Sequence, residues 1–227
     1  MANRTTMVSA SSDTPTFYQS SEAENLTNKK FGDDTHHTTF DTTGHQTMVG
    51  NGKPWRDELS DAVSLQQTGP SVSRNTTEST VDFTTGANLS DFIYCNIQLN
   101  HDKDLTAGIY PHIHWFQAEN NVPFFLIRYR WQLELVAKTT AWQDLVCRTL
   151  AVAYTSGTIN QIAYSAAISA PEGASLSDIV QFKIFRDNAN TSGAFTGTDP
   201  YTATVGITAF DIHFQVNSLG STDQYTK

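Results

Sequence analysis

The stretch DFIYCNIQLN, residues 91–100, alternates apolar and polar side chains with a period of two. Its odd-numbered positions carry Ile93, Cys95, Ile97 and Leu99, and amide side chains occupy the even-numbered positions from 96 onward. Successive side chains of a β-strand point to opposite faces. The segment therefore predicts a strand with one buried and one solvated face, which is typical of antiparallel sheets.

Seven further segments have a strand-like composition, and turn signals such as those at 85–88, 120–121 and 171–173 separate them. No apolar repeat of 3.6 residues indicates a helix among them. Many strands with turns between them predict a sandwich or a barrel. We therefore expect an all-β fold, an eight-stranded β-sandwich of jelly-roll type with two packed sheets. The expected strands are 78–85, 90–100, 110–118, 123–138, 143–155, 158–168, 177–187 and 202–217.

Two of these strands depart from simple alternation. In 123–138, apolar residues begin both faces, with Phe124 and Leu126 on the face that should meet water. A loop, the N-terminal arm or a second subunit would then cover that face. In 202–217, the apolar positions change from odd to even numbers, which reverses the faces of the strand. A β-bulge near Thr208 and Ala209 would restore the burial.

The first 54 residues differ in composition, and we expect them to form an extended polar arm. Only six of residues 1–55 are Leu, Ile, Val or Phe, well below the level of roughly 20% that a core requires. Ordering such a segment costs about 1–2 kcal/mol per residue in backbone entropy, so contacts outside it must hold it. We expect contacts with partner subunits through Phe17, Phe31, Phe40 and Trp55. A tail that lies on its own domain is the alternative.

Residues 55–77 are expected to connect this arm to a sandwich domain of residues 78–227. Pro54 precedes the segment WRDEL, residues 55–59. Proline is tolerated at the first position of a helix, so the sequence predicts a short helical turn here. The residues that follow, up to 77, are polar and indicate a linker.

Composition and charge argue against several classes of partner. The net charge is −9 and the 14 lysine and arginine residues are scattered, so we expect no nucleic-acid partner, because basic side chains must neutralise the phosphates. No run approaches the roughly 18 apolar residues of a membrane span, and the N-terminus lacks the apolar part of a signal peptide. We therefore expect no membrane partner, and synthesis in a cytoplasm.

The two cysteines, Cys95 and Cys147, lie in apolar strand segments and not at a metal-binding spacing. This placement predicts two buried free thiols in a reducing compartment, with a single disulfide as the alternative.

Histidines supply the strongest candidate for chemistry. On a strand, His112 and His114 point the same way, and Asp211 and His213 face away from the core if Phe210 and its even-numbered neighbours are buried. Two neighbouring strands would then bring three imidazoles and a carboxylate together. Three histidines form a ligand set of catalytic zinc or iron sites. We expect instead a surface or interface histidine pair, hydrogen-bonded to Asp211, with a metal at His112, His114 and His213 as the alternative.

The spacing of His112, His114 and Glu119 resembles the metal-binding element of cupins, which are also jelly rolls. That resemblance implies a metal-dependent enzyme. The sequence contains no Gly-x-Ser-x-Gly elbow, no phosphate-binding glycine loop and no Cys-x-x-Cys pair. We therefore expect no enzymatic activity and no cofactor.

Three aromatic residues lie in loops rich in Gly, Thr and Ser or in the C-terminal tail: Phe195, Tyr201 and Tyr225. Exposed aromatic rings suit contact with sugars or with proteins. These residues are the candidates for ligand or interface contacts.

Five short motifs lie along residues 55–227: WRDEL at 55–59, PHIHW at 111–115, FRD at 185–187, FDIHF at 210–214 and the ending LGSTDQYTK at 219–227. Together they resemble a group of uncharacterised tailed-bacteriophage virion proteins. The resemblance implies a trimeric β-sandwich on the head, neck or tail of a virion that assembles in the host cytoplasm. It also implies other virion proteins as partners, of the capsid, portal, neck or tail.

The first interpretation of function is therefore a structural virion protein that self-associates through its sandwich and is anchored by its arm. A fibre or spike module that binds a receptor or a host-surface glycan is the second interpretation. A cupin-like metalloenzyme is the third.

Overall fold

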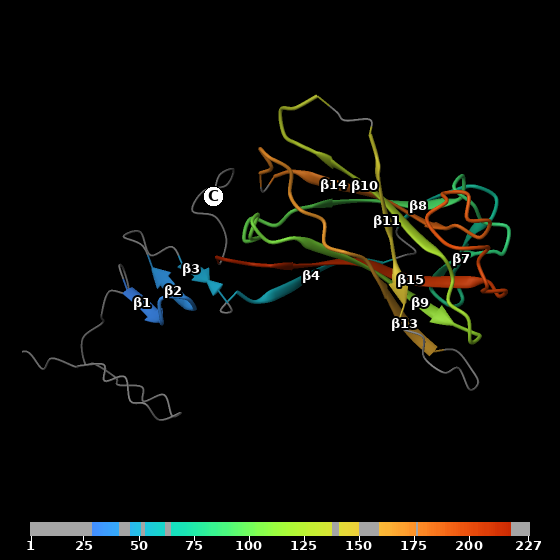
Figure 1. Cartoon of the computed structure of the whole chain (residues 1–227), viewed down its shortest axis with the longest axis horizontal. Coiled ribbons are helices and arrows are strands. Elements are labelled where there is room, and N and C mark those ends of the chain that lie inside the picture. The colour runs from blue at the N-terminus through green and yellow to red at the C-terminus, as the bar shows by residue number, and fades with distance from the viewer. Residues whose placement is uncertain are drawn as a thin grey trace, which may run out of the picture.

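The computed structural model describes residues 29–40, 46–50, 53–61, 65–137, 141–149, 159–175 and 177–218. Across these residues the chain forms strands in three antiparallel sheets, without an α-helix. Two large sheets pack face to face, and a small sheet lies beside them (Figure 1). The prediction of an all-β sandwich is confirmed. In the described part of the chain, no helix is long and apolar enough to span a membrane.

The first large sheet has the strand order β11-β10-β14-β8-β5. Its strands are β5 (Gln66–Thr68), β8 (Phe92–Gln98), β10 (Phe125–Gln132), β11 (Gln143–Val146) and β14 (Ile179–Arg186). The second large sheet has the order β12-β13-β9-β15-β7-β6, and β4 also pairs with β15. Its strands are β4 (Trp55–Asp61), β6 (Val72–Asn75), β7 (Thr80–Phe83), β9 (Ile109–Gln117), β12 (Arg148–Thr149), β13 (Ile159–Tyr164) and β15 (Val205–Gln215).

Seven of the eight expected strands correspond to one observed strand each: β7, β8, β9, β10, β13, β14 and β15. The expected strand 143–155 is divided between β11 and β12, which lie in different sheets. Along the chain the seven strands alternate between the two sheets. As a result, β14 lies between β10 and β8 in the first sheet, and β15 lies between β9 and β7 in the second. This interleaving is the double Greek key of a jelly roll.

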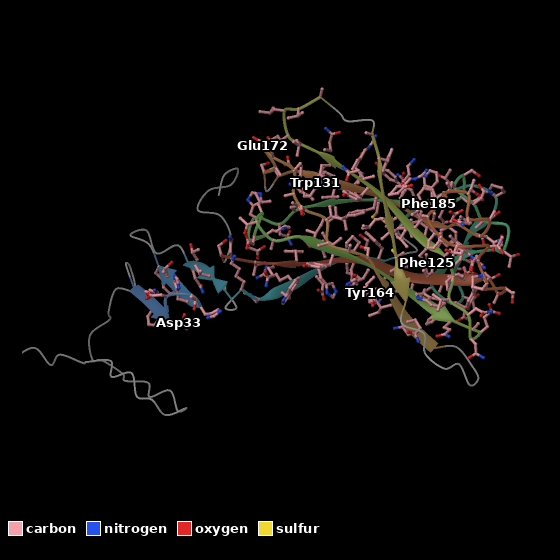
Figure 2. The ribbon with its side chains drawn as sticks, viewed as in Figure 1. Asp33, Phe125, Trp131, Tyr164, Glu172 and Phe185 are labelled. Carbon is pink, nitrogen blue, oxygen red and sulfur yellow. The ribbon has the colours of Figure 1, made fainter. Side chains whose placement is uncertain are left out.

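The core lies between the two large sheets, and side chains from both fill it (Figure 2). The odd-numbered residues of β8 are buried, as the alternation predicts. Trp115 of β9 meets Phe125 of β10 edge-on, with ring centroids 5.6 Å apart. Phe182 of β14 and Phe210 of β15 make a second contact between the sheets at 5.0 Å. Large interlocking aromatic pairs fix the separation of the two sheets.

The bulge predicted in the last strand is present. The register between β15 and β9 shifts between Ile207 and Ala209. Ile207 lies in the core before the shift, and Phe210 lies in the core after it. The extra residue therefore keeps the apolar side chains of both halves on the same face.

A loop covers the apolar outer face of β10. Phe124 stacks on Phe195, with ring centroids 4.3 Å apart and planes 8° from parallel. Leu126 is fully buried beside its cross-strand partners Phe185 and Val146. Of the three explanations offered by the sequence, cover by a loop, the one after β14, is observed here.

A buried ion pair fastens this loop to the sandwich. Arg186 Nε donates to Asp199 Oδ2 at 2.7 Å, and neither side chain meets solvent. The same guanidinium donates to the carbonyls of Tyr201, Ala203 at 2.7 Å and Phe83 at 3.3 Å. Buried charges are tolerated when they are paired and hydrogen-bonded in this way. The pair therefore positions residues 187–203.

Residues 55–77 differ from the prediction of a helical turn and a linker. Residues 55–61 form strand β4, which pairs with residues 209–215 of β15, and β5 and β6 follow. The carbonyl of Pro54 accepts a hydrogen bond from Val216 N, which extends this pairing. The helical prediction is wrong because long-range pairing with β15 outweighs the local preference of proline for a helix start.

The described part of the first 54 residues is a small sheet and not an extended arm. Its strands are β1 (Lys29–Gly32), β2 (His37–Phe40) and β3 (Gln46–Val49), in that order. Phe31 and Phe40 meet edge-on at 6.1 Å, and Phe31 remains 37% exposed. Met48 N donates to the carbonyl of Asn217 at 2.6 Å, which joins the small sheet to its own chain. Phe17 lies outside the described residues.

An ion pair also holds the loop after β8. Lys53 Nζ bonds Asp104, whose carboxylate is buried and accepts from Thr106 N at 3.0 Å and Thr106 Oγ1 at 2.6 Å. Burial alone would raise the pKa of Asp104, but the hydrogen bonds from Lys53 and Thr106 outweigh burial, and the pKa lies below its ordinary value.

Both cysteines, Cys95 and Cys147, are buried free thiols, as predicted.

Candidate functional site

The histidine cluster predicted from the sequence forms on the outer face of the second large sheet. Strands β9 and β15 are neighbours, with His112 opposite Asp211 and Tyr110 opposite His213. Directly opposed residues of an antiparallel pair share a face. Ile113 of β9 points into the core, so its neighbours on either side point outward. The sheet thus places three imidazoles and one carboxylate together.

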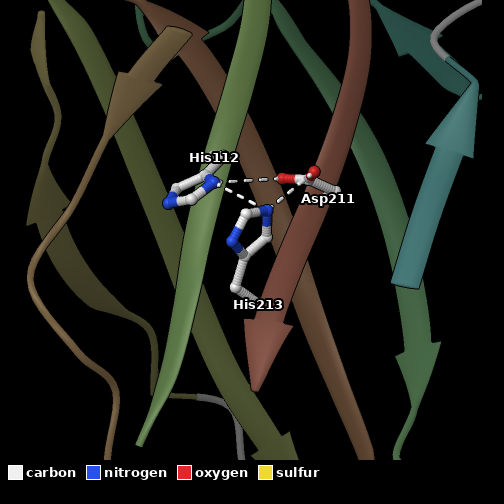
Figure 3. Close-up of side chains that lie close together, drawn as sticks. All are labelled: His112, Asp211 and His213. Atoms are coloured by element: carbon white, nitrogen blue, oxygen red, sulfur yellow. Dashed lines mark hydrogen bonds and ion pairs between the residues drawn. The ribbon is translucent and has the colours of Figure 1, made fainter. Parts of the chain in front are cut away.

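The polar atoms of the cluster are closely spaced (Figure 3). His112 Nδ1 lies 3.1 Å from His213 Nε2 and 3.6 Å from Asp211 Oδ1. His213 Nε2 lies 3.3 Å from Asp211 Oδ2. His114 Nε2 lies 3.1 Å from that same oxygen. Asp211 is therefore the common partner of all three histidines.

Asp211 is the most buried member of the cluster. Its side chain is 5% exposed, and its two oxygens have different environments. Oδ2 is within hydrogen-bonding distance of His114 and His213, whereas Oδ1 is buried without a hydrogen-bond partner. A buried oxygen that lacks a partner is costly unless a cation or a donor satisfies it.

The two histidines of β9 differ in their titration. Burial, followed by the nearby His213, lowers the pKa of His112. The hydrogen bond to Asp211 raises the pKa of His114 despite its burial. The lowered pKa of His112 favours its neutral imidazole, which keeps a lone pair on one nitrogen.

A fifth residue joins the cluster from β4. Asp57 lies opposite His213 in the register, and its Oδ1 is 3.1 Å from His213 Nε2. The expected helical turn over residues 55–59 does not predict this contact, which depends on the pairing of β4 with β15. Trp55 and Leu59 are four residues apart, a spacing that puts them on one face of a strand or of a helix, so this stretch alone carries no decisive signal for a strand.

Glu119 does not take the place that the cupin resemblance gives it. Its carboxylate accepts hydrogen bonds from Thr202 N and, at 2.7 Å, from Thr202 Oγ1. These bonds join the end of β9 to the segment before β15 and leave the carboxylate out of the histidine cluster.

The loop aromatics do not form the exposed contact surface that the sequence predicted. Tyr201 is buried, its ring packs against Trp115 at 5.6 Å, and its hydroxyl accepts from Ala118 N at 2.7 Å. The prediction is wrong for Tyr201 because Arg186 binds its carbonyl and draws this part of the loop inward. Phe195 is partly buried by its stacking on Phe124. Tyr225 lies outside the described residues.

Large apolar side chains surround the histidine cluster on the same side of the sheet. We call this surface of the second large sheet the outer face. It consists of the histidine cluster and of Trp55, Leu59, Tyr110, Ile162 and Tyr164 around it. Leu59 lies opposite Asp211, Tyr164 opposite His112, and Ile162 opposite His114. Trp55 contacts Tyr110 at 5.4 Å. The exposed fractions are 63% for Leu59, 54% for Trp55, 44% for Ile162 and 38% for Tyr164.

No protein-family model and no curated protein matches this chain. Among solved structures, it is similar to a cycloisomaltooligosaccharide glucanotransferase from Paenibacillus sp., complexed with cycloisomaltoheptaose. The identity is 13% and the TM-score 0.36 over 67% of this chain. It is also similar to the CBM22-1-GH10 modules of endo-1,4-beta-D-xylanase 10B from Clostridium thermocellum, complexed with xylohexaose, with 13% identity and a TM-score of 0.32 over 76% of this chain. The alignments span only 18% and 27% of those chains. TM-scores this low do not establish a shared fold.

Proposed function

We propose that this chain is a structural subunit of a virion, like the tailed-bacteriophage proteins that it resembles, and that copies of it associate through the outer face. The observation that carries the proposal is the cluster of large exposed apolar side chains on one sheet face. Large exposed apolar side chains that gather on one face, rimming a polar cluster as here, are typical of interaction sites. Aromatic anchors such as Trp55 are enriched at the centre of protein interfaces.

The occupant that we propose for this face is another copy of the chain. The alternative of strand pairing along the edge of β4 is disfavoured by its charged residues, because edge charges block the addition of another strand. Arg56 is already paired with Asp102, and Glu58 accepts from Asn100 Nδ2 at 2.9 Å. The apolar side chains of β4 point instead to the outer face.

The small sheet β1–β3 is the proposed anchor to other virion proteins of the capsid, neck or tail. Among the described residues it carries an exposed phenylalanine, Phe31, and it reaches the sandwich through the backbone of Thr47 and Met48. Residues 30–36 are exposed and could meet another protein, in line with the docking role proposed for residues 1–54.

A charge placed on the outer face tests self-association. Leu59→Glu should weaken it at least tenfold, measured as the dissociation constant in sedimentation velocity, because a carboxylate would have to lose its water in the interface. Leu135→Glu is the matched control, since Leu135 is fully exposed in the turn after β10 and away from this face. Equal dissociation constants for Leu59→Glu and the wild type would refute the assignment of this face.

Deletion of residues 1–52 tests the anchoring role. We expect the shortened chain to remain a folded oligomer that no longer joins particles in the virus that encodes it. Normal incorporation of the shortened chain would remove the docking function from this segment.

Glycan binding is the second candidate function, because the rings of Trp55 and Tyr164 are both exposed on the outer face. Aromatic rings with one open side suit stacking on sugars. A glycan array probed with the full chain should then give signals that Trp55→Ala and Tyr164→Ala reduce, and an array without signal would exclude this role.

A further inference from the structure

We propose that His112, Asp211 and His213 bind one divalent transition-metal ion, with zinc as the best match, at the centre of the outer face. All three ligands come from a single chain, so the site does not depend on self-association. The proposal thus goes beyond the structural role given above.

The spacing of the three ligand atoms carries the argument. With bonds of about 2.0–2.1 Å, the ligands of a tetrahedral zinc ion lie about 3.4 Å apart. The observed separations are 3.1 Å between His112 Nδ1 and His213 Nε2, 3.6 Å from His112 Nδ1 to Asp211 Oδ1, and 3.3 Å from His213 Nε2 to Asp211 Oδ2. His112 approaches one oxygen of the carboxylate and His213 the other, so the two nitrogens and the carboxylate are spaced much as the ligands of a tetrahedral ion are. The fourth position is left for a water molecule, as in sites with three protein ligands.

The unpartnered oxygen of Asp211 is an independent observation that points to a cation. Oδ1 is buried and has no hydrogen-bond partner, yet it lies on the side of the carboxylate that faces His112. Leaving a buried carboxylate oxygen unsatisfied costs free energy. A metal ion between Asp211 and the two imidazoles would satisfy this oxygen.

A network of hydrogen bonds alone satisfies the cluster poorly. His213 Nε2 lies within 3.3 Å of three groups: His112 Nδ1, Asp211 Oδ2 and Asp57 Oδ1. One imidazole N–H can donate well to only one of them. A metal ion in place of that proton would bind the imidazoles and the carboxylate together, with two carboxylates close by to favour a positive charge.

His114 is a positioning residue in this arrangement. Its Nε2 lies 3.1 Å from Asp211 Oδ2, the oxygen that His213 also approaches. Hydrogen bonds of this kind orient a ligating carboxylate, and their loss typically lowers metal affinity about 10–100-fold. His114 would therefore strengthen the site without touching the metal.

The first experiment titrates the full chain, freed of metal by a chelator, with zinc against a chromophoric competitor and with cobalt by visible absorption. We expect one equivalent of metal per chain and the intense cobalt bands of a four-coordinate site. His112→Gln and His213→Gln should each lower zinc affinity more than 100-fold, beyond the effect expected for a residue that only orients a ligand. The matched control is His36→Gln in the small sheet, which should bind as the wild type does.

His114→Gln separates positioning from ligation. It should bind zinc about 10–100-fold more weakly than the wild type while keeping the wild-type positions of the cobalt bands. A shift of those bands would make His114 a ligand and contradict the ligand set proposed here. Wild-type affinity in both His112→Gln and His213→Gln, or less than one equivalent in the wild type, would overturn the site.

A measurement on the wild type alone covers the case of variants that do not fold. Zinc should protect His112 and His213 from modification by diethylpyrocarbonate, read by peptide mass mapping, while His36 is modified equally with and without zinc. Equal modification of all three histidines in both states would also overturn the proposal.

Discussion

Replacement of Arg186 by methionine should destabilise the sandwich more than any loss of a surface charge. The guanidinium is fully buried and binds Asp199 and three backbone carbonyls. Methionine fills a similar volume but leaves Asp199 as an unpaired buried charge. Breaking a buried pair from one side typically costs about 3–5 kcal/mol. Because the lost hydrogen bonds are part of this cost, we expect the free energy of unfolding to fall by about that amount.

The assay is urea denaturation of the wild type and the variant, followed by tryptophan fluorescence. The control is Arg128→Met, which breaks the partly exposed pair of Arg128 Nε with Asp144 Oδ1 at 2.6 Å. Pairs of that kind contribute less than about 1 kcal/mol. A loss below about 1 kcal/mol in Arg186→Met, or equal losses in the two variants, would refute the role of the buried pair in holding the loop.

Three further predictions follow from other parts of the fold. The pKa of Asp104 is lowered from its ordinary value of 3.8, so the contacts of its carboxylate stabilise the fold above that value. This stabilisation is lost as the pH falls through the lower pKa of the folded state. Below about pH 4, the urea midpoint of the wild type should therefore fall more steeply than that of Asp104→Asn. Gly69 has a φ of 98°, and a Cβ at this position would lie 2.1 Å from the carboxylate oxygen Oδ1 of Asp91. Gly193 has a φ of 68° but open space around it, so Gly193→Ala should cost about 1 kcal/mol and Gly69→Ala clearly more. Equal losses of unfolding free energy in the two variants would contradict the crowding at Gly69. Burial raises the pKa of Cys95 to about 12 and also raises the pKa of Cys147, so Ellman's reagent should label neither thiol in the folded chain and both in urea; rapid labelling of the folded chain would show that the thiols are accessible.

Strand-like composition and the turn signals between segments were enough to predict the eight sandwich strands, and alternation of side chains predicted the placement of the histidines. His112 and His114 had to point away from the core because Ile113 and Trp115 between and beside them are apolar. The bulge in β15 could be predicted because the apolar positions change from odd to even numbers along the strand. An inserted residue is the usual way to keep both sets of side chains on the buried face.

Long-range pairing explains what the sequence did not predict. Strand β4 is short and charged, and its order comes from β15, about 150 residues later in the chain. Once β4 was treated as helical, the approach of Asp57 to His213 could not be foreseen. The burial of Tyr201 depends likewise on a hydrogen bond from Arg186, which no local pattern of the loop encodes.

The solution mass of the full-length chain tests the central claim most directly. If the outer face joins copies of this protein, native mass spectrometry at micromolar concentration should give an oligomer, and the resemblance to virion proteins predicts three chains of 25.1 kDa each. A single chain across the micromolar range, with the outer face open to water, would contradict the account.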